Sequence, residues 1–139
     1  MSRYVLDTDI LTLYAQGHPA IVRRVGAEPA GEVAITVLTV EEQLSGWYTQ
    51  VRRAKRPESL ARAYYELARS VQFLGRLPIL FYTEDAIGRY EQLRKQRIRI
   101  GRTDLRIAAT VLEHQASLVT RNLHDFGTVP GLHVEDWSK

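Results

Sequence analysis

Short apolar runs alternate with longer amphipathic stretches along this chain. The apolar runs have the length of buried strands, and they lie at 3–7, 32–36, 77–82, 117–120 and 132–136. Apolar residues recur at helical spacing between them, which predicts helices at about 8–15, 19–26, 40–55, 57–75, 83–96 and 103–115. Strands that alternate with helices are typical of a parallel sheet covered on both faces. The pattern therefore predicts an α/β fold.

Particular residues mark several ends of these elements. Pro57 is expected to end the helix before it, because proline disfavours helical conformation in the preceding residue. Gly75 suits the C-terminal cap of the next helix. Thr83 and Thr103 are expected to start the last two helices, since a threonine hydroxyl accepts a hydrogen bond from a free helix N–H.

The composition is that of one globular domain spanning 1–139. A chain of 139 residues with 45% hydrophobic and 25% charged residues can bury a core of ordinary size, and no repeat or linker divides it. Because there is no Cys, disulfides and thiolate chemistry are excluded. The chain has no apolar run of the ~20 residues that span a bilayer and no signal-peptide pattern, so a cytoplasmic protein is expected.

Basic side chains are unevenly distributed. The net charge is only +3, yet residues 89–106 contain seven Lys and Arg with Glu91 and Asp104 as the only acids, and a second cluster, RRAKR, lies at 52–56. Arg-rich clusters in a nearly balanced chain favour a phosphate-bearing partner. Composition alone leaves open whether that partner is RNA or whether the arginines meet an acidic protein surface.

Acidic side chains follow the predicted strands or begin the helices. Asp7 lies after the first strand, Glu42 after the second, and Asp104 at the start of a helix. A parallel sheet brings the carboxyl ends of its strands to one edge. Two carboxylates ~4 Å apart repel by roughly 4 kcal/mol at an effective dielectric near 20, unless a cation or a proton intervenes. Oxygen ligands without His or Cys suit Mg²⁺ or Mn²⁺, which equips a site for phosphodiester hydrolysis.

Each of these side chains also has a purely structural explanation. Asp7 suits a helix N-cap, and Thr39 with Glu42 fits a capping box. Asp104 would favour the dipole of its helix, and Asn122 suits a cap or turn after the fourth strand. From the residues taken singly, both readings stay open.

Four stretches, in order and at the usual spacing, match the motifs of one known family. They are YVLDTDIL (4–11), ITVLTVEEQLSGW (35–47), IGRTDLRIAA (100–109) and LVTRNLHDFGTVPGLHVEDW (118–137). On these motifs the chain resembles the PIN-domain ribonucleases, and within them the VapC-type toxins of prokaryotic toxin–antitoxin pairs. The motifs span nearly the whole chain, so the resemblance is specific.

The resemblance identifies individual acids. Asp7 corresponds to the first acid of the family, Glu42, four residues before a glycine, to the second, and Asp104 to the third. Glu41, next to Glu42, is expected to face elsewhere. Asp9 stands where Asn is common in the family.

Two positions depart from the family pattern. Many PIN domains have a fourth Asp where this chain has Asn122, although some VapC-type toxins also have Asn there. Arg106 stands at a position that is often apolar or aromatic, which would alter the fit of the substrate.

The resemblance implies a three-layer α/β/α PIN-like fold with a central, mostly parallel sheet of four to five strands. It implies an endoribonuclease of a toxin–antitoxin system, dependent on Mg²⁺ or Mn²⁺ and inhibited by a cognate antitoxin. The substrate would be single-stranded or loop RNA, in tRNA, rRNA or mRNA. We expect Asp7, Glu42 and Asp104 to hold the metal and Asn122 to orient a water or the scissile phosphate.

Partners are predicted for two further regions. Arg97, Arg99 and Arg102 are expected to bind the phosphates of the RNA, with RRAKR as the next candidate. The amphipathic helices between 40 and 75 are expected to pack a homodimer or to receive the antitoxin.

Two rival functions remain open. A haloacid-dehalogenase-like phosphatase also has acids after an apolar strand, with Asp7 as its nucleophile and Asp9 as its acid. However, Leu11 stands where that family has Thr or Val, and its later metal motif is absent from the sequence. The second rival is a binding protein without catalysis, in which the acids are only helix caps.

Overall fold

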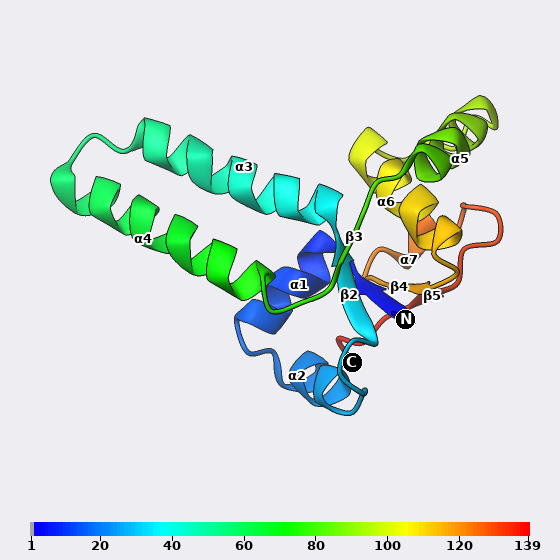
Figure 1. Cartoon of the computed structure of the whole chain (residues 1–139), viewed down its shortest axis with the longest axis horizontal. Helices are drawn as coiled ribbons and strands as arrows, with labels where there is room; N and C mark the ends of the chain where they lie inside the picture. Colours follow the sequence, from blue (N-terminus) through cyan, green and yellow to red (C-terminus); the bar gives the residue numbers. More distant parts are fainter. Residues whose placement is uncertain (1) are drawn as a thin grey trace.

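The structure is a computed structural model that describes residues 2–139 (Figure 1). Its strands are β1 Tyr4–Leu6, β2 Val33–Thr36, β3 Ile79–Leu80, β4 Ser117–Val119 and β5 Val134–Glu135. Its helices are α1 Thr8–Ala15, α2 Pro19–Gly26, α3 Val37–Arg53, α4 Pro57–Leu74, α5 Glu84–Lys95, α6 Arg102–Glu113 and α7 Leu123–Phe126. The alternation of strands with helices that the sequence predicts is confirmed.

The strands form one parallel sheet in the order β3-β2-β1-β4-β5. Strand β1 is central, with Tyr4 opposite Val33 of β2 on one side and Ser117 of β4 on the other. Because every pair is parallel, the carboxyl ends of all five strands lie at the same edge. The predicted five-stranded α/β fold is confirmed.

Side chains alternate across the sheet and fill two separate cores. On β1, Val5 belongs to the core under α5, α6 and α7, whereas Leu6 belongs to the core under α1, α2 and α4. Leu118 and Val119 divide in the same way on β4. This period of two is what a strand covered on both faces requires. The arrangement is therefore the three-layer one that the family resemblance implies.

Helices α3 and α4 pack against each other and extend away from the sheet as a long hairpin (Figure 1). Pro57 is the first residue of α4, and Gly75 follows its last residue as the C-cap, as predicted. We call α3, α4 and the turn 54–56 the α3–α4 hairpin. No helix among residues 2–139 is both long and apolar enough to cross a membrane.

Two predicted helix starts and one strand are corrected. Helix α3 begins at Val37, because the hydroxyl of Thr36 accepts the hydrogen bond from the Thr39 N–H at 3.2 Å. Thr39 is thus inside the helix, and the capping box with Glu42 was wrong. Helix α6 begins at Arg102, one residue before the predicted Thr103, and Gly101 is its N-cap. Thr83 caps α5 as predicted. The third strand, predicted at 77–82, comprises only Ile79–Leu80.

Candidate active site at the carboxyl edge of the sheet

Asp7 lies where the central strand β1 passes into α1, and the residue is buried, with 7% of its surface exposed. Its Oδ1 accepts a hydrogen bond from the Ile10 N–H at 2.9 Å, so the predicted N-cap is confirmed. Its Oδ2 accepts a second bond from the Thr120 hydroxyl at 2.5 Å. Burial raises the pKa of Asp7; the two hydrogen bonds oppose this, and the charges of Asp9 and Asp104 add to it. The carboxylate is therefore held rigidly in an environment that disfavours its charge.

Thr120 connects two neighbouring strand ends, and the sequence did not single it out. It is fully buried directly after β4, which pairs with β1. Its hydroxyl donates to Asp7 and accepts a bond from the Asn122 N–H at 2.9 Å. In the sequence, Thr120 ends an apolar strand and lies in the motif that begins LVTRN, but neither feature specifies its contact with Asp7.

Glu42 reaches the same edge from α3, the helix that follows β2. Its Oε1 accepts a hydrogen bond from the Thr8 hydroxyl at 2.6 Å, and the buried Thr39 hydroxyl lies 3.2 Å from that of Thr8. Glu41 is exposed and makes no hydrogen bond or ion pair of its side chain with another residue of 2–139. Adjacent helical side chains point about 100° apart, so only Glu42 turns toward the end of β1.

Asp104 interacts through its charge with the other carboxylates of this edge. It lies in the first turn of α6 and is half-buried. Burial raises the pKa of Asp104, and the charges of Glu42 and Asp125 raise it further. Asp104 in turn raises the pKa of Asp7. The fold thus brings Asp104 within electrostatic reach of the other two acids predicted from the sequence, Asp7 and Glu42.

Asn122 caps the short helix α7 and binds Asp125. Its Oδ1 accepts a bond from the Asp125 N–H at 3.2 Å, and its Nδ2 donates to Asp125 Oδ2 at 3.0 Å. The structural prediction for Asn122 is therefore confirmed, while its role toward water or phosphate remains a prediction. Asp125, whose role could not be predicted from the sequence, joins the carboxylate edge because its charge raises the pKa of Asp104.

The oxygen donors at this edge are of the type that binds a hard divalent cation. Within residues 2–139, no three His, Cys, Asp or Glu side chains are already arranged around one ion-sized space. The donors of Asp7, Glu42 and Asp104 are nevertheless all carboxylate oxygens, the ligands that Mg²⁺ and Mn²⁺ prefer. Burial is the main reason that the pKa values of Asp7 and Asp104 are raised, and repulsion between carboxylates adds to it. A bound cation would relieve both.

Known proteins resemble the chain over its full length, although no family model matches it. A tRNA(fMet)-specific endonuclease VapC from Shigella flexneri is 30% identical over 142 residues, covering 99% of this chain and all of the relative. This chain belongs to the VapC family. A ribonuclease VapC2 from Haemophilus influenzae is 29% identical over 141 residues, with 99% of both chains covered. The crystal structure of DNA-bound VapBC from Salmonella typhimurium superimposes with a TM-score of 0.80, at 25% identity and with 99% of both chains covered.

Membership of the VapC family decides between the functions that the sequence left open. The VapC relatives are named ribonucleases and an endonuclease, which favours the nuclease interpretation over a phosphatase or a binding protein without catalysis. The edge that carries Asp7, Glu42 and Asp104 is accordingly the candidate nuclease site of this VapC protein.

Arginines predicted to bind RNA surround the start of α6. Arg97, Arg99 and Arg102 are exposed, and none forms an ion pair with another residue in the described range 2–139. Arg97 follows the end of α5 with a positive φ of 59°, which turns the chain toward α6. Arg106 is different, because it is half-buried with its guanidinium 5.2 Å from the centre of the Tyr90 ring.

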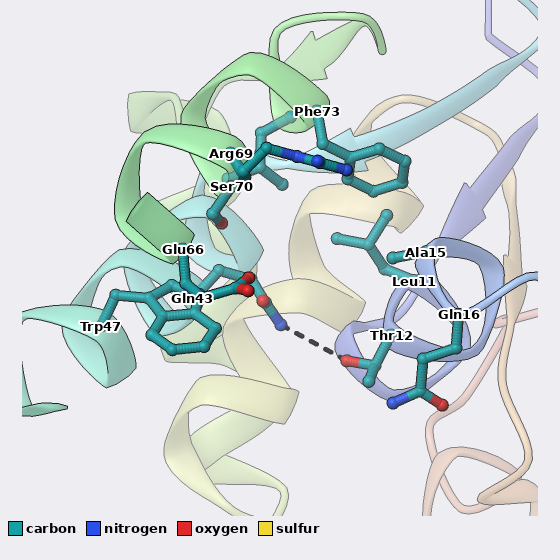
Figure 2. Close-up of a pocket in the computed structure, with 11 residues that line it drawn as sticks. Leu11, Thr12, Ala15, Gln16, Gln43, Trp47, Glu66, Arg69, Ser70 and Phe73 are labelled. Atoms are coloured by element: carbon teal, nitrogen blue, oxygen red, sulfur yellow. Dashed lines mark hydrogen bonds between the residues drawn. The ribbon is translucent and has the colours of Figure 1, made fainter. Parts of the chain in front are cut away.

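A cavity of about 320 Å³ lies apart from the carboxylates, between α1, α3 and α4 (Figure 2). Its walls combine apolar side chains with a few polar ones, and Gln43 donates across it to the Thr12 hydroxyl at 3.5 Å. The lining residues are Leu11, Thr12, Ala15, Gln16, Gln43, Trp47, Glu66, Arg69, Ser70, Phe73 and Leu74. Only Glu66 and Arg69 are charged, so this cavity suits a binding surface better than a catalytic site.

Proposed function

We propose that this VapC protein is a divalent-metal-dependent endoribonuclease, the toxin of a toxin–antitoxin pair. The observation that carries the proposal is the convergence of Asp7, Glu42, Asp104 and Asp125 at the carboxyl edge of the sheet, where Asp104 is coupled to the other three. Mutual repulsion at an exposed edge has no benefit for stability. It is consistent with a site that binds a cation and then a phosphodiester.

The chain's own residues would prepare this site before any ligand arrives. Asp7, Glu42 and Asp104 would hold Mg²⁺ or Mn²⁺. Such an ion activates a water and neutralises charge on the phosphate. Thr120 fixes the carboxylate of Asp7 through a buried hydrogen bond, and Thr8 orients Glu42 toward it.

RNA would be held by its phosphates and hydrolysed in line. Arg97, Arg99 and Arg102 stand exposed beside Asp104 in sequence and would bind phosphates on either side of the cut. Hydrolysis adds water across the P–O3′ bond, so the products carry a 5′-phosphate and a 3′-hydroxyl. The relative from Shigella flexneri is named for tRNA(fMet), which makes tRNA loops the first substrate to test.

An antitoxin is the proposed protein partner. Solved structures that resemble this chain include VapBC from Salmonella typhimurium and a toxin–antitoxin complex from Klebsiella pneumoniae. The cavity between α1, α3 and α4 offers a concave, partly apolar surface for such a partner (Figure 2). The exposed Tyr64 and Tyr65 of α4 would serve the contact with a second copy in a homodimer.

Cleavage of bulk tRNA by the purified chain tests the proposed activity. We expect cleavage with Mg²⁺ or Mn²⁺, no cleavage with EDTA, and 5′-phosphate ends that can be ligated without prior phosphorylation. The Asp104→Asn variant, purified in parallel, controls for a contaminating nuclease and is expected to be inactive. Cleavage that persists in EDTA, or equal cleavage by the variant, contradicts the proposal.

A further inference from the structure

Asp9 and Arg121 form an ion pair at the rim of the carboxylate edge. The guanidinium of Arg121 donates twice to Asp9 Oδ2, from Nη2 at 2.7 Å and from Nε at 3.0 Å. The two residues are 112 positions apart, so the pair ties the first turn of α1 to the segment between β4 and α7. Both side chains remain about half exposed, at 54% for Asp9 and 47% for Arg121.

The position of the pair relates it to the nuclease site. Asp9 is two residues after Asp7. Arg121 lies between Thr120, which binds Asp7, and Asn122, which binds Asp125. Besides Asp9, the charge of Asp136 acts on Arg121, and that of Asp7 acts on it to a smaller extent, so the guanidinium lies within electrostatic reach of Asp7.

Stability does not account for this pair. Ion pairs between exposed side chains contribute little to folding, and solvent screens them. The geometry also leaves much of the arginine unused, because a guanidinium has five N–H donors and Asp9 accepts two of them on a single oxygen. Three N–H donors remain for another acceptor at a place where five acids, counting Asp9 and Asp125, would otherwise repel a polyanion.

We propose that Arg121 binds a phosphate of the RNA next to the scissile bond and that Asp9 holds its guanidinium in place for that contact. The inference rests on the proposed nuclease function and adds a substrate-binding residue to it. The planar fork of arginine matches two phosphate oxygens, and the ion pair restricts its rotamers before RNA arrives. Arg121 comes from the segment after β4, so it contacts the RNA independently of the arginines before α6.

Binding of labelled bulk tRNA, measured as a function of salt, tests the contact. The Asp104→Asn background keeps the RNA intact during the measurement. Replacing Arg121→Gln in that background should weaken binding roughly 5- to 10-fold near 0.1 M salt and reduce the slope of log K against log salt by about 1. Arg121→Lys should recover part of the affinity and most of the slope, since it restores the charge but not the fork.

The Asp9→Asn variant tests whether Arg121 contacts a phosphate or only neutralises the charge of Asp9. If Arg121 only cancels the charge of Asp9, then Asp9→Asn combined with Arg121→Gln should restore wild-type affinity. If Arg121 binds phosphate, Arg121→Gln should weaken RNA binding by the same factor whether residue 9 is Asp or Asn. The double variant should then bind more weakly than Asp9→Asn alone. Restored affinity, or an unchanged salt slope for Arg121→Gln, overturns the inference.

Cleavage measurements keep this inference distinct from the proposed function. With Asp104 intact, Arg121→Gln should raise KM for tRNA while kcat stays within about 3-fold of wild type, a split typical of lost substrate binding. A wild-type chain that neither binds nor cleaves tRNA contradicts the nuclease proposal itself. A wild-type chain that cleaves tRNA while Arg121→Gln keeps the same KM and salt slope overturns only the role of Arg121.

Discussion

The carboxylate edge and the α3–α4 hairpin use their side chains in opposite ways. At the edge, Asp7, Glu42 and Asp125 are each held by hydrogen bonds from Thr120, Thr8 or Asn122. Along the hairpin, aromatic side chains remain exposed, including Tyr64 at 55% and Tyr65 at 56%. The edge is thus ordered by the fold itself, whereas the exposed face of the hairpin is where we propose that a partner binds.

The two regions also differ in charge. The edge gathers carboxylates, and burial together with their mutual repulsion raises the pKa values of Asp7 and Asp104. The tip of the hairpin gathers cations around a hollow of about 620 Å³, lined among others by Arg53, Lys55 and Arg56. Function should therefore divide between them, with chemistry at the edge and contacts with partners on the hairpin. Substitutions in one region should leave the role of the other unchanged.

The largest effect is expected from Asp104→Asn, which should reduce RNA cleavage by roughly 100-fold or more because it removes a proposed metal ligand and its charge. Tyr64→Ser is the matched change on the hairpin and should leave the cleavage rate within about 2-fold of wild type. Initial rates on tRNA at saturating Mg²⁺ measure both. An equal loss for the two variants would abolish the division between the regions.

Glu42 and Glu41 sharpen the comparison within a single helix, at the point where the hairpin begins. Glu42→Gln should lower cleavage nearly as much as Asp104→Asn, since only Glu42 turns toward Thr8 and the end of β1. Glu41→Gln should stay close to wild type, because its exposed side chain points elsewhere. The reverse ranking would shift the proposed site by one residue along α3.

The sequence was sufficient to predict those parts of the site that depend on local chain order. Asp7 follows the central strand directly, and Asp104 lies in the first turn of its helix, so strand and helix patterns alone placed them. The start of α3 was harder, because Thr36 and Thr39 are both competent caps and the choice depends on where β2 ends. The error moved the helix start by three residues and offered a capping box as a second explanation of Glu42, beside its assignment to the site.

Contacts between distant parts of the chain were beyond sequence reasoning. The bond between Thr8 and Glu42 spans 34 positions, and that between Asp7 and Thr120 spans 113. Such pairs form only once β1 is inserted between β2 and β4, an order that periodicity does not specify. No role could be assigned to Asp125 for the same reason, since its charge acts on a carboxylate from another helix.

A moderate effect is expected from the arginines beside α6. Changing Arg99 and Arg102 together to Gln should weaken tRNA binding roughly 10-fold and reduce its salt slope by about 1 to 2. The matched pair on the hairpin, Arg52 and Arg53, should change the slope by less. The opposite result would place the RNA on the basic tip of the hairpin. Fluorescence anisotropy at several salt concentrations measures both pairs.

The pH dependence of stability tests the repulsion at the edge. Because the pKa of Asp104 lies above its ordinary 3.8, the folded state binds more protons than the unfolded chain between 3.8 and the raised value. The contribution of Asp104 to stability therefore falls as pH rises through that window, and the penalty is complete at neutral pH. Without divalent metal, Asp104→Asn should melt about 1–3 °C above wild type near pH 7, since solvent screens a half-exposed carboxyl.

That difference in melting temperature should narrow as the pH falls through this window and vanish below 3.8, where the wild-type carboxyl becomes protonated in both states. Melting curves in EDTA across this range measure it, and Tyr64→Ser should show no comparable dependence. A variant that melts below wild type at every pH would mean that the favourable position of Asp104 in the first turn of α6 outweighs the repulsion.

The smallest effect is expected at Asn122, where one amide separates two interpretations of the edge. Asn122→Asp loses the Nδ2 donor that binds Asp125 and places a carboxylate against another carboxylate. Without metal the variant should therefore be less stable by about 1 kcal/mol, as expected for one lost hydrogen bond.

With Mg²⁺ the added charge of Asn122→Asp should tighten ion binding, because the affinity of hard cations rises with ligand charge. Combining Asn122→Asp with Asp125→Asn restores the donor and the total charge, and serves as the control. In a Mg²⁺ titration of cleavage, the single variant should need less Mg²⁺ than wild type, and the combined variant should need as much as wild type. Superimposable curves for all three proteins would leave Asn122 as the cap of α7 alone.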